Sequence, residues 1–316
     1  METMLQPKTV NLSDYTTFKV GGECEHFFEA ATMKELQYGI FYADEKNLPY
    51  IILGGGSNIL FDDAGYKGVV IKLNMKDFSV NDCILKAQAG AKMSEVIIYA
   101  IENGYSGMEW ASGLPGSVGG AVRGNAGAFG GCIADNIMKV TYLDEKEKIR
   151  TIDASKCGFG YRDSMFKHSR KFAILEAEFM MNKDKTVEEL KSKFEKYINY
   201  RNTNHPLDYP SAGSVFKNID DKKEASLCLK INPRMNEFLK KWQGKISTAY
   251  LIEDCNLKGV RIGGARISEK HANFIVNESN AASDDIKKLI KTVIEKVREK
   301  YGITLKPEIM IIGTGS

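Results

Sequence analysis

The chain has 316 residues, of which 43% are hydrophobic and 27% are charged, and its formal net charge is +3. This length and composition are typical of a globular protein with about two domains, or three small ones. The basic residues are dispersed and no apolar run approaches the roughly 18 residues of a membrane span, so we expect neither a nucleic-acid groove nor a membrane segment. The six cysteines form no C-x-x-C pair, and the first ten residues lack an apolar signal segment. We therefore expect free thiols, no metal site and a cytoplasmic protein.

Helices and strands alternate in the first third of the chain. A capping box of threonine and glutamate at residues 32–35 predicts the start of an amphipathic helix. Strand-like apolar segments follow at residues 49–53, 68–74 and 83–90. The segment "MSEVIIYAIENG" at residues 93–104 predicts a second helix, which its glycine ends. This succession indicates a mixed α and β fold.

The rest of the chain continues in the same manner. "NIMKVTYLD" and "FAILEAEFMM" are typical of a pair of strands, and a second capping box at residues 186–189 predicts a long helix. The apolar residues of this helix recur at core spacing from Leu190 to Ile198. The segment "RNTNHPLDYPSAG" at residues 201–213 is typical of a linker, so we expect a domain boundary near His205. A last amphipathic helix should end at Gly302, with a strand after it.

The first glycine-rich site, "GGGSN", stands where a strand should end. Gly54, Gly55 and Gly56 let the backbone turn sharply and point successive N–H groups into a concavity, to which Ser57 and Asn58 add side-chain donors. Two interpretations stay open, a nest for a phosphate or diphosphate and a tight turn. No Gly-Lys-Ser/Thr follows, and the G-x-G-x-x-G fingerprint is absent. A nucleotide in a Rossmann crevice is therefore not expected.

The second glycine-rich site, "GLPGSVGGAVRGNAGAFGG", spans residues 113–131. A flexible linker would be polar and rich in serine, whereas this segment carries Leu114, Val118 and Phe129 together with a rigid Pro115. We interpret it as a folded loop whose backbone approaches a ligand closely. Two such loops suggest a long ligand with a diphosphate between them, and FAD fits that description.

Eight motifs, taken together and in this order, resemble the UDP-N-acetylenolpyruvoylglucosamine reductase family, in particular its type II branch. The resemblance covers nearly the whole chain. The motifs are "TTFKVGG", "GGGSN", "GLPGSVGG", "NAGAFGG", "YRDS", "PSAGSVFKN", "LKGVRIGGARISEKHANFIVN" and "LKPE".

The resemblance implies an α+β fold with a two-lobed FAD-binding domain of the vanillyl-alcohol oxidase type and a C-terminal α/β substrate-binding domain. Residues 1–73 with 303–316 would form the first lobe, 74–204 the second, and 205–302 the substrate domain. The implied reaction is the NADPH-dependent reduction of UDP-N-acetylglucosamine enolpyruvate to UDP-N-acetylmuramate, through non-covalent FAD, in peptidoglycan precursor synthesis. The implied partners are the UDP-sugar and NADPH, with no obligate protein partner.

The resemblance also assigns site residues. Ser214 would donate a proton to the substrate carbon, although the residues alone favour a turn residue after Gly213, and only the resemblance reverses that interpretation. Arg162 would hold the developing enolate, because its planar fork suits a carboxylate, and Glu308 would polarise the carboxylate or relay the proton. Tyr161, Lys217 and Asn218 would contact the substrate. The residues expected to hold FAD are Gly54, Gly55, Gly56, Ser57, Asn58, Gly113, Pro115, Gly116, Ser117, Gly119, Gly120, Asn125, Ala126 and Gly127.

Two alternative functions and one structural question stay open at this point. One is a flavin oxidase of the same fold acting on another small substrate, for which Cys132 beside the second loop is the nearest residue that could tether the flavin. Another is a flavin-binding scaffold without activity. The stretch at residues 219–250 is longer than the resemblance leads us to expect, and it is either a surface helix or a lid over the substrate.

Overall fold

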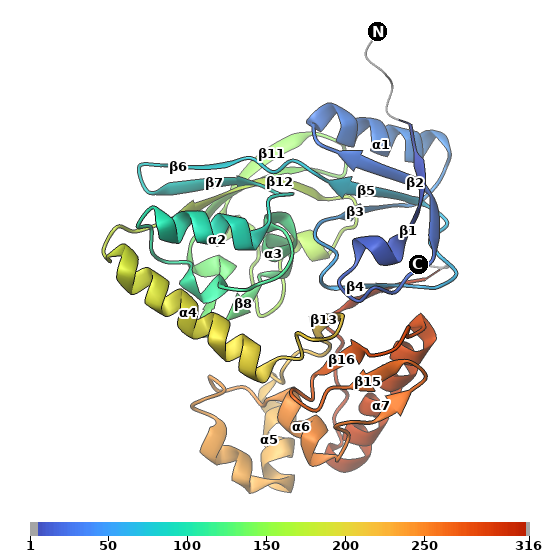
Figure 1. The fold of residues 1–316 in the computed structure, drawn as a ribbon, viewed down its shortest axis with the longest axis vertical. Helices are drawn as coiled ribbons and strands as arrows, with labels where there is room; N and C mark the ends of the chain where they lie inside the picture. The colour runs from blue at the N-terminus through green and yellow to red at the C-terminus, as the bar shows by residue number, and fades with distance from the viewer. Residues whose placement is uncertain (1–5, 314–316) are drawn as a thin grey trace. The chain divides into compact units, whose positions relative to one another are not determined.

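The computed structural model describes residues 6–313, which divide into two compact units (Figure 1). Each unit combines segments that are far apart in the sequence. Unit 1 contains residues 6–10, Cys24–Gly56 and Lys67–Arg201, and unit 2 contains Asn11–Glu23, Ser57–Tyr66 and residues 202–313.

A four-stranded sheet in unit 1 has the order β1-β2-β5-β3, and β5 pairs in parallel with both β2 and β3. The parallel strands need a crossover, which helix α1 (Met33–Glu45) provides between β2 and β3. The predicted capping box at its start is confirmed, because the Thr32 side chain accepts from the Glu35 N–H and the Glu35 carboxylate accepts from the Thr32 N–H. The strands are β1 (Lys8–Asn11), β2 (Glu23–Ala30), β3 (Tyr50–Leu53) and β5 (Val69–Leu73).

A five-stranded antiparallel sheet forms the rest of the unit 1 framework, in the order β11-β10-β12-β7-β6. The predicted strand pair is confirmed, since β10 and β12 are neighbours. Helix α2 (Met93–Glu102) packs against the sheet, with Tyr99 edge-on to Phe78 of β6 at 5.4 Å between ring centroids. The strands are β6 (Phe78–Asn81), β7 (Ile84–Gln88), β10 (Ile137–Leu143), β11 (Ile149–Asp153) and β12 (Ala173–Met180).

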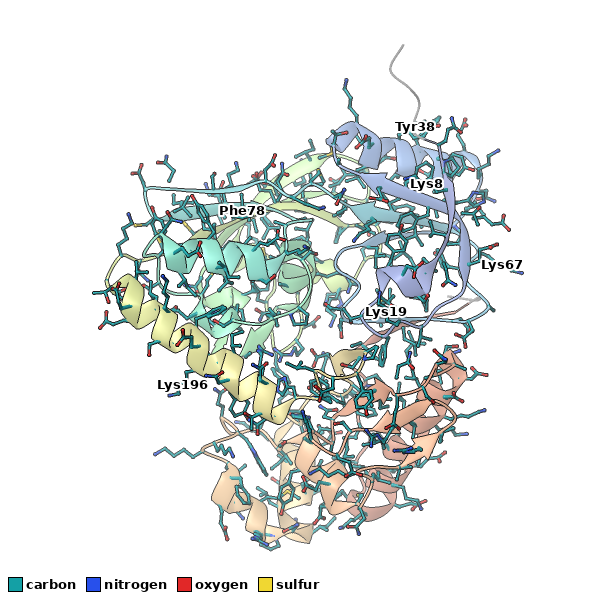
Figure 2. All side chains as sticks on the ribbon, in the orientation of Figure 1. Lys8, Lys19, Tyr38, Lys67, Phe78 and Lys196 are labelled. Atoms are coloured by element: carbon teal, nitrogen blue, oxygen red, sulfur yellow. The ribbon has the colours of Figure 1, made fainter. Side chains whose placement is uncertain are left out.

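Two short elements and one long helix complete unit 1. Helix α3 (Val118–Gly124) starts inside the second glycine-rich segment, and a small hairpin of β8 (Gly127–Ala128) and β9 (Gly131–Cys132) follows it. Helix α4 (Val187–Asn204) begins at the second predicted capping box, which is also confirmed. Lys8, Lys67 and Lys196 extend outward from three separate parts of this unit (Figure 2), in keeping with dispersed basic residues.

Unit 2 is built around a four-stranded antiparallel sheet, β13-β16-β15-β14, and a separate parallel pair of β4 with β17. Helix α7 (Ser283–Tyr301) buries an apolar stripe that includes Ile286, Leu289 and Val293, and it ends at Gly302 in the left-handed conformation, as predicted. The remaining elements are β4 (Ile59–Phe61), β13 (Ser211–Ser214), β14 (Arg261–Ile262), β15 (Ala265–Ile267), β16 (Phe274–Asn277), β17 (Met310–Ile312), α5 (Lys222–Ile231) and α6 (Thr248–Asp254).

The predicted linker at residues 201–213 was partly wrong. Helix α4 continues through its first four residues and ends at Asn204. The helix ends there because the next residue, His205, precedes a proline, and a residue before proline disfavours helical geometry. The linker is thus shorter than predicted, since β13 already starts at Ser211. The division into three domains stays a prediction.

The long stretch at residues 219–250 contains helix α5 and a six-residue 3-10 helix, Pro233–Phe238. Cys228 and Met235 from these elements are fully buried in the unit 2 core. The outer face of α5 exposes Leu227 and Ile231, which are 43% and 48% accessible. The stretch is therefore a surface helix whose inner face belongs to the unit 2 core.

Candidate active site

The two glycine-rich loops meet at backbone distance in unit 1. A Cβ atom added to Gly55 would lie 2.5 Å from the Cα atom of Gly116 and 3.0 Å from the backbone nitrogen of Ser117. A Cβ atom on Gly54 would collide with the Ser117 hydroxyl. Glycine is therefore required at position 55, where the neighbouring atoms are backbone, whereas a side chain at position 54 would need the Ser117 hydroxyl to turn away. The two loops that we expected to share one ligand thus lie next to each other.

The backbone N–H groups at the start of α3 are occupied, whereas two in the first loop are open. The first three N–H groups of α3 all donate within the protein, two of them to carbonyl oxygens of segment 89–91 and one to the Ser117 hydroxyl. By contrast, the N–H groups of Gly55 and Gly56 find no hydrogen-bond partner among residues 6–313. Gly56 also has a φ of 65°, which turns the chain back on itself. Such a turn with open donors fits an anionic diphosphate.

Two basic residues that sequence reasoning missed support these loops. The Lys72 ammonium donates to the Gly54 carbonyl at 3.0 Å, and Nε of Arg201 donates to the Ser112 carbonyl at 2.8 Å. Burial lowers the pKa of both groups. Nη2 of Arg201 is buried and has no hydrogen-bond partner in the described part of the chain. A lysine between apolar strand residues in "VVIKL" was the available signal for Lys72; for Arg201 the sequence held none.

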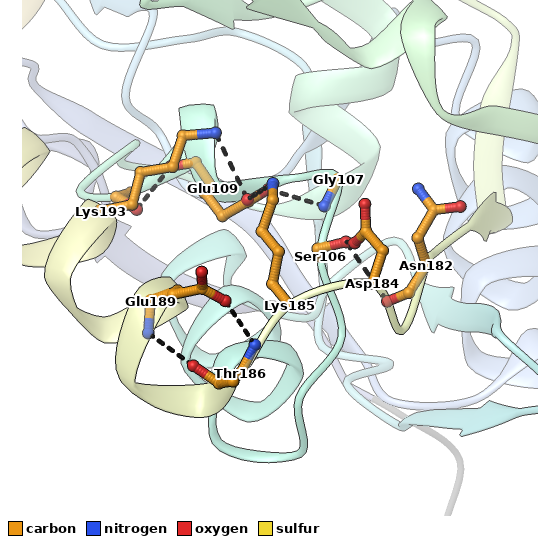
Figure 3. Close-up of polar contacts among 10 residues, drawn as sticks. Ser106, Gly107, Glu109, Asn182, Asp184, Lys185, Thr186, Glu189 and Lys193 are labelled. Atoms are coloured by element: carbon orange, nitrogen blue, oxygen red, sulfur yellow. Dashed lines mark hydrogen bonds and ion pairs between the residues drawn. The ribbon is translucent and has the colours of Figure 1, made fainter.

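A buried carboxylate fixes the start of the second loop (Figure 3). Glu109 is only 3% exposed, and it accepts from the Lys185 ammonium at 3.0 Å and the Lys193 ammonium at 3.4 Å. It also accepts from the Gly107 N–H at 2.6 Å. Burial alone would raise the pKa of Glu109, but backbone N–H groups and Lys185 outweigh burial and lower it. The short 3-10 helix Glu109–Ala111 is thereby tied to α4 just before the loop begins.

Arg162 projects from a tight turn in unit 1. Its φ is 54°, which is the left-handed region that arginine rarely adopts. Nη2 of its guanidinium donates to the Gly127 carbonyl at 2.7 Å, and the guanidinium lies 5.5 Å from the Tyr161 ring centroid. A Cβ atom on Gly127 would come within 3.2 Å of Nη1 of Arg162. The structure thus brings Arg162 and Tyr161 next to the glycine-rich segment that contains Asn125, Ala126 and Gly127.

Ser214 and Glu308 share one framework in unit 2. Ser214 ends β13 after Gly213, whose φ of 74° favours glycine. The next residue, Val215, donates its N–H to the Asn273 carbonyl at 2.8 Å and accepts from the Glu308 N–H at 2.7 Å. Nδ2 of Asn58 donates to the Glu308 carbonyl at 3.2 Å. Three residues expected at the site, Asn58, Ser214 and Glu308, are therefore held by one hydrogen-bonded network.

Lys217 and Asn218 continue from the same strand end. The Lys217 N–H donates to the Lys306 carbonyl at 3.0 Å, and the Thr248 hydroxyl donates to the Lys217 carbonyl at 2.6 Å. Oδ1 of Asn218 accepts from the Thr248 N–H at 3.1 Å, where α6 begins. The backbone from 214 to 218 is therefore fixed on both sides.

Three further features concern a thiol, the side chains that could bind a metal, and the helices. Burial, with a smaller effect of the neighbouring Asp135, raises the pKa of the Cys132 thiol, so Cys132 is a poor nucleophile. Across residues 6–313, no group of three or more His, Cys, Asp and Glu side chains is placed to hold a metal ion. None of the described helices has both the length and the apolar character needed to cross a membrane.

The fold and the glycine cradle define a flavoprotein. A family profile described as an FAD binding domain matches residues 24–153, which include both glycine-rich loops. A second profile, the C-terminal domain of UDP-N-acetylenolpyruvoylglucosamine reductase, matches residues 205–312. The chain belongs to the UDP-N-acetylenolpyruvoylglucosamine reductase family.

Relatives of this family match over nearly the whole chain. The enzyme of that name from Acaryochloris marina is 38% identical over 96% of this chain and 92% of its own length. The one from Caldanaerobacter subterraneus is 36% identical over 95% and 91%. The crystal structure of the Thermus caldophilus reductase covers 98% of this chain and 99% of its own, with 28% identity and a TM-score of 0.77. These matches confirm the predicted α+β fold class and the resemblance.

Proposed function

We propose that the protein reduces UDP-N-acetylglucosamine enolpyruvate to UDP-N-acetylmuramate, with NADPH as the reductant, as a cytoplasmic step of peptidoglycan precursor synthesis. Family membership over the whole chain is the observation that carries this proposal. FAD held by the glycine loops would supply the redox chemistry, which is the transfer of a hydride from NADPH to the enolpyruvyl group.

The residues present fit FAD. The glycine contacts leave no room for side chains between the two loops, and the N–H groups of Gly55 and Gly56 are open for the diphosphate. Lys72 adds a positive charge directly behind the first loop, through its bond to the Gly54 carbonyl. We propose that the loop residues named from the sequence, Gly54–Asn58 and Gly113–Gly127, hold the cofactor without a covalent bond.

Three residues are proposed to act on the substrate. Arg162 pairs its planar fork with the enolpyruvyl carboxylate and stabilises the negative charge that develops there. Ser214 donates a proton to C2 of the enolpyruvyl group, and Glu308 polarises the carboxylate or returns a proton to the serine. Tyr161, Lys217 and Asn218 contact the UDP-sugar. The fixed backbone around Ser214 supports its role, because a general acid must be held at a defined position.

The rival flavin oxidase is less well supported. A tethered flavin needs a reactive side chain at the loops, and the raised pKa of Cys132 keeps its thiol protonated. Release of all flavin by mild acid would show that no tether exists. A scaffold without activity would have no use for the carefully anchored Arg162, Ser214 and Glu308.

The test is anaerobic and needs only the purified holoenzyme. NADPH should bleach the flavin absorption band, and UDP-N-acetylglucosamine enolpyruvate added afterwards should restore it. An oxidase would regain the band with oxygen and not with the enolpyruvyl substrate. A scaffold would not bleach at all.

A further inference from the structure

The turn that carries Arg162 is closed but strained. The Gly160 and Asp163 backbones exchange two hydrogen bonds, of 3.0 and 3.2 Å, with Arg162 between them at a φ of 54°. A residue with a Cβ atom avoids this left-handed backbone conformation and adopts it only where neighbouring groups hold it there. The groups that hold the turn therefore decide where the guanidinium points.

The Asn125 side chain is one of these groups. Its Nδ2 donates to the Gly160 carbonyl at 2.8 Å, and its Oδ1 accepts from the Ala134 N–H at 3.0 Å. The residue is only 6% exposed and stands at the end of α3, with a φ of 42°. Both ends of this amide are thus occupied by the protein itself, one by the turn that carries Arg162 and the other by the short 3-10 helix Ile133–Asp135.

Lys167 holds the same turn from its other side. Its ammonium donates to the Arg162 carbonyl at 2.9 Å. The tip of the Arg162 side chain is bound separately, by the Gly127 carbonyl two residues after Asn125. The backbone carbonyl of Arg162 is therefore held by Lys167, and its guanidinium is held by Gly127.

We propose that Asn125 and Lys167 are positioning residues that keep the Arg162 guanidinium aimed at the substrate carboxylate, and that the Asn125 side chain is not a flavin ligand. This inference rests on the role proposed above for Arg162. The backbone of Asn125 remains part of the proposed flavin cradle. The Asn125 side chain links the flavin loop to the turn that carries Arg162, the residue proposed to bind the substrate carboxylate.

Asn125→Gly is the main test, because glycine accepts the left-handed conformation and only the side-chain amide is lost. The FAD dissociation constant and the rate of flavin reduction by NADPH should stay within about threefold of the parent. Reoxidation by the enolpyruvyl substrate should slow about 10- to 100-fold, the usual result of a misaligned charge. Loss of FAD binding with normal reoxidation of the remaining holoenzyme would overturn the proposal.

Lys167→Met provides a second variant should Asn125→Gly fold poorly. It should also slow only the reoxidation, and Lys167→Arg should restore most of the rate. Ser164→Ala is the matched control, since the buried Ser164 hydroxyl donates to the Arg123 carbonyl at 2.7 Å and so joins the same two segments without touching Arg162. It should lower the melting temperature and leave reoxidation unchanged. If Ser164→Ala slows reoxidation as much as Asn125→Gly does, the effect is general loosening and the proposal is wrong.

A double-mutant cycle with Arg162→Ala separates this inference from the proposed function. If Asn125 acts through Arg162, Asn125→Gly should slow reoxidation by less than about twofold once Arg162 is alanine. Additive slowing would overturn the inference and leave the role of Arg162 intact. If Arg162→Ala alone leaves reoxidation unchanged, the role of Arg162 fails and the inference fails with it.

Discussion

Alanine at position 55 tests the contact between the two glycine-rich loops. In Gly55→Ala the new methyl group would lie 2.5 Å from the Cα atom of Gly116 and 2.9 Å from its carbonyl carbon. The loops must separate by about 1 Å to restore the roughly 3.5 Å of a favourable carbon contact. Both partners are backbone, so no side-chain rotation relieves the clash. Overpacking of this kind costs about 1–3 kcal/mol.

Because the proposed cradle holds FAD only with the two loops at this spacing, the FAD dissociation constant should rise about 5- to 150-fold. Titration of the apoprotein with FAD, followed by flavin fluorescence, measures it. Gly39→Ala in α1 is the matched control. Its new methyl group would lie 2.9 Å from Cδ1 of Ile71 in β5, and this side-chain atom can move aside. The control should retain normal FAD affinity. Equal affinities in the parent and in Gly55→Ala would refute the cradle.

Three further predictions concern single residues. Gly56→Val should abolish flavin retention on gel filtration, because a branched residue resists the φ of 65° at this position; full FAD occupancy would contradict it. Ser214→Ala should leave reduction by NADPH within a few-fold of normal and slow reoxidation by the substrate about 10²–10⁴-fold in stopped flow; equal slowing of both half-reactions would indicate a structural defect. Glu109→Gln should lower the free energy of unfolding by about 1–2 kcal/mol at neutral pH, because the partly exposed Lys185 and Lys193 lose their carboxylate partner. The folded-state pKa of Glu109 lies below its ordinary 4.5. The difference in free energy of unfolding between the parent and Glu109→Gln should therefore be complete above pH 4.5 and shrink as the pH falls through the folded-state pKa. A difference that stays constant with pH in urea titrations would contradict the stabilising role of the ionised carboxylate.

Local signals predicted local structure. The helix starts at Thr32 and Thr186 were correct because a capping box involves only four consecutive residues. The glycine loops were identifiable because few other functions need so many glycines together. The left-handed conformation of Arg162 could not be predicted, since arginine avoids it and only distant contacts enforce it. The anchoring of Arg201 on Ser112 escaped prediction for the same reason, as its partner lies 89 positions away.

The pairing of β4 with β17 has a consequence for the order of events during synthesis. Asn58 and Glu308 are bonded across a separation of 250 residues, and at about 5–20 residues per second a ribosome needs roughly 10–50 s to cover that interval. Throughout that time β4 is without its strand neighbour, and its three apolar residues, all buried in the folded protein, must be shielded in another way. A chain released before Met310 would lack this strand, so incomplete products of translation should be inactive and open to proteases.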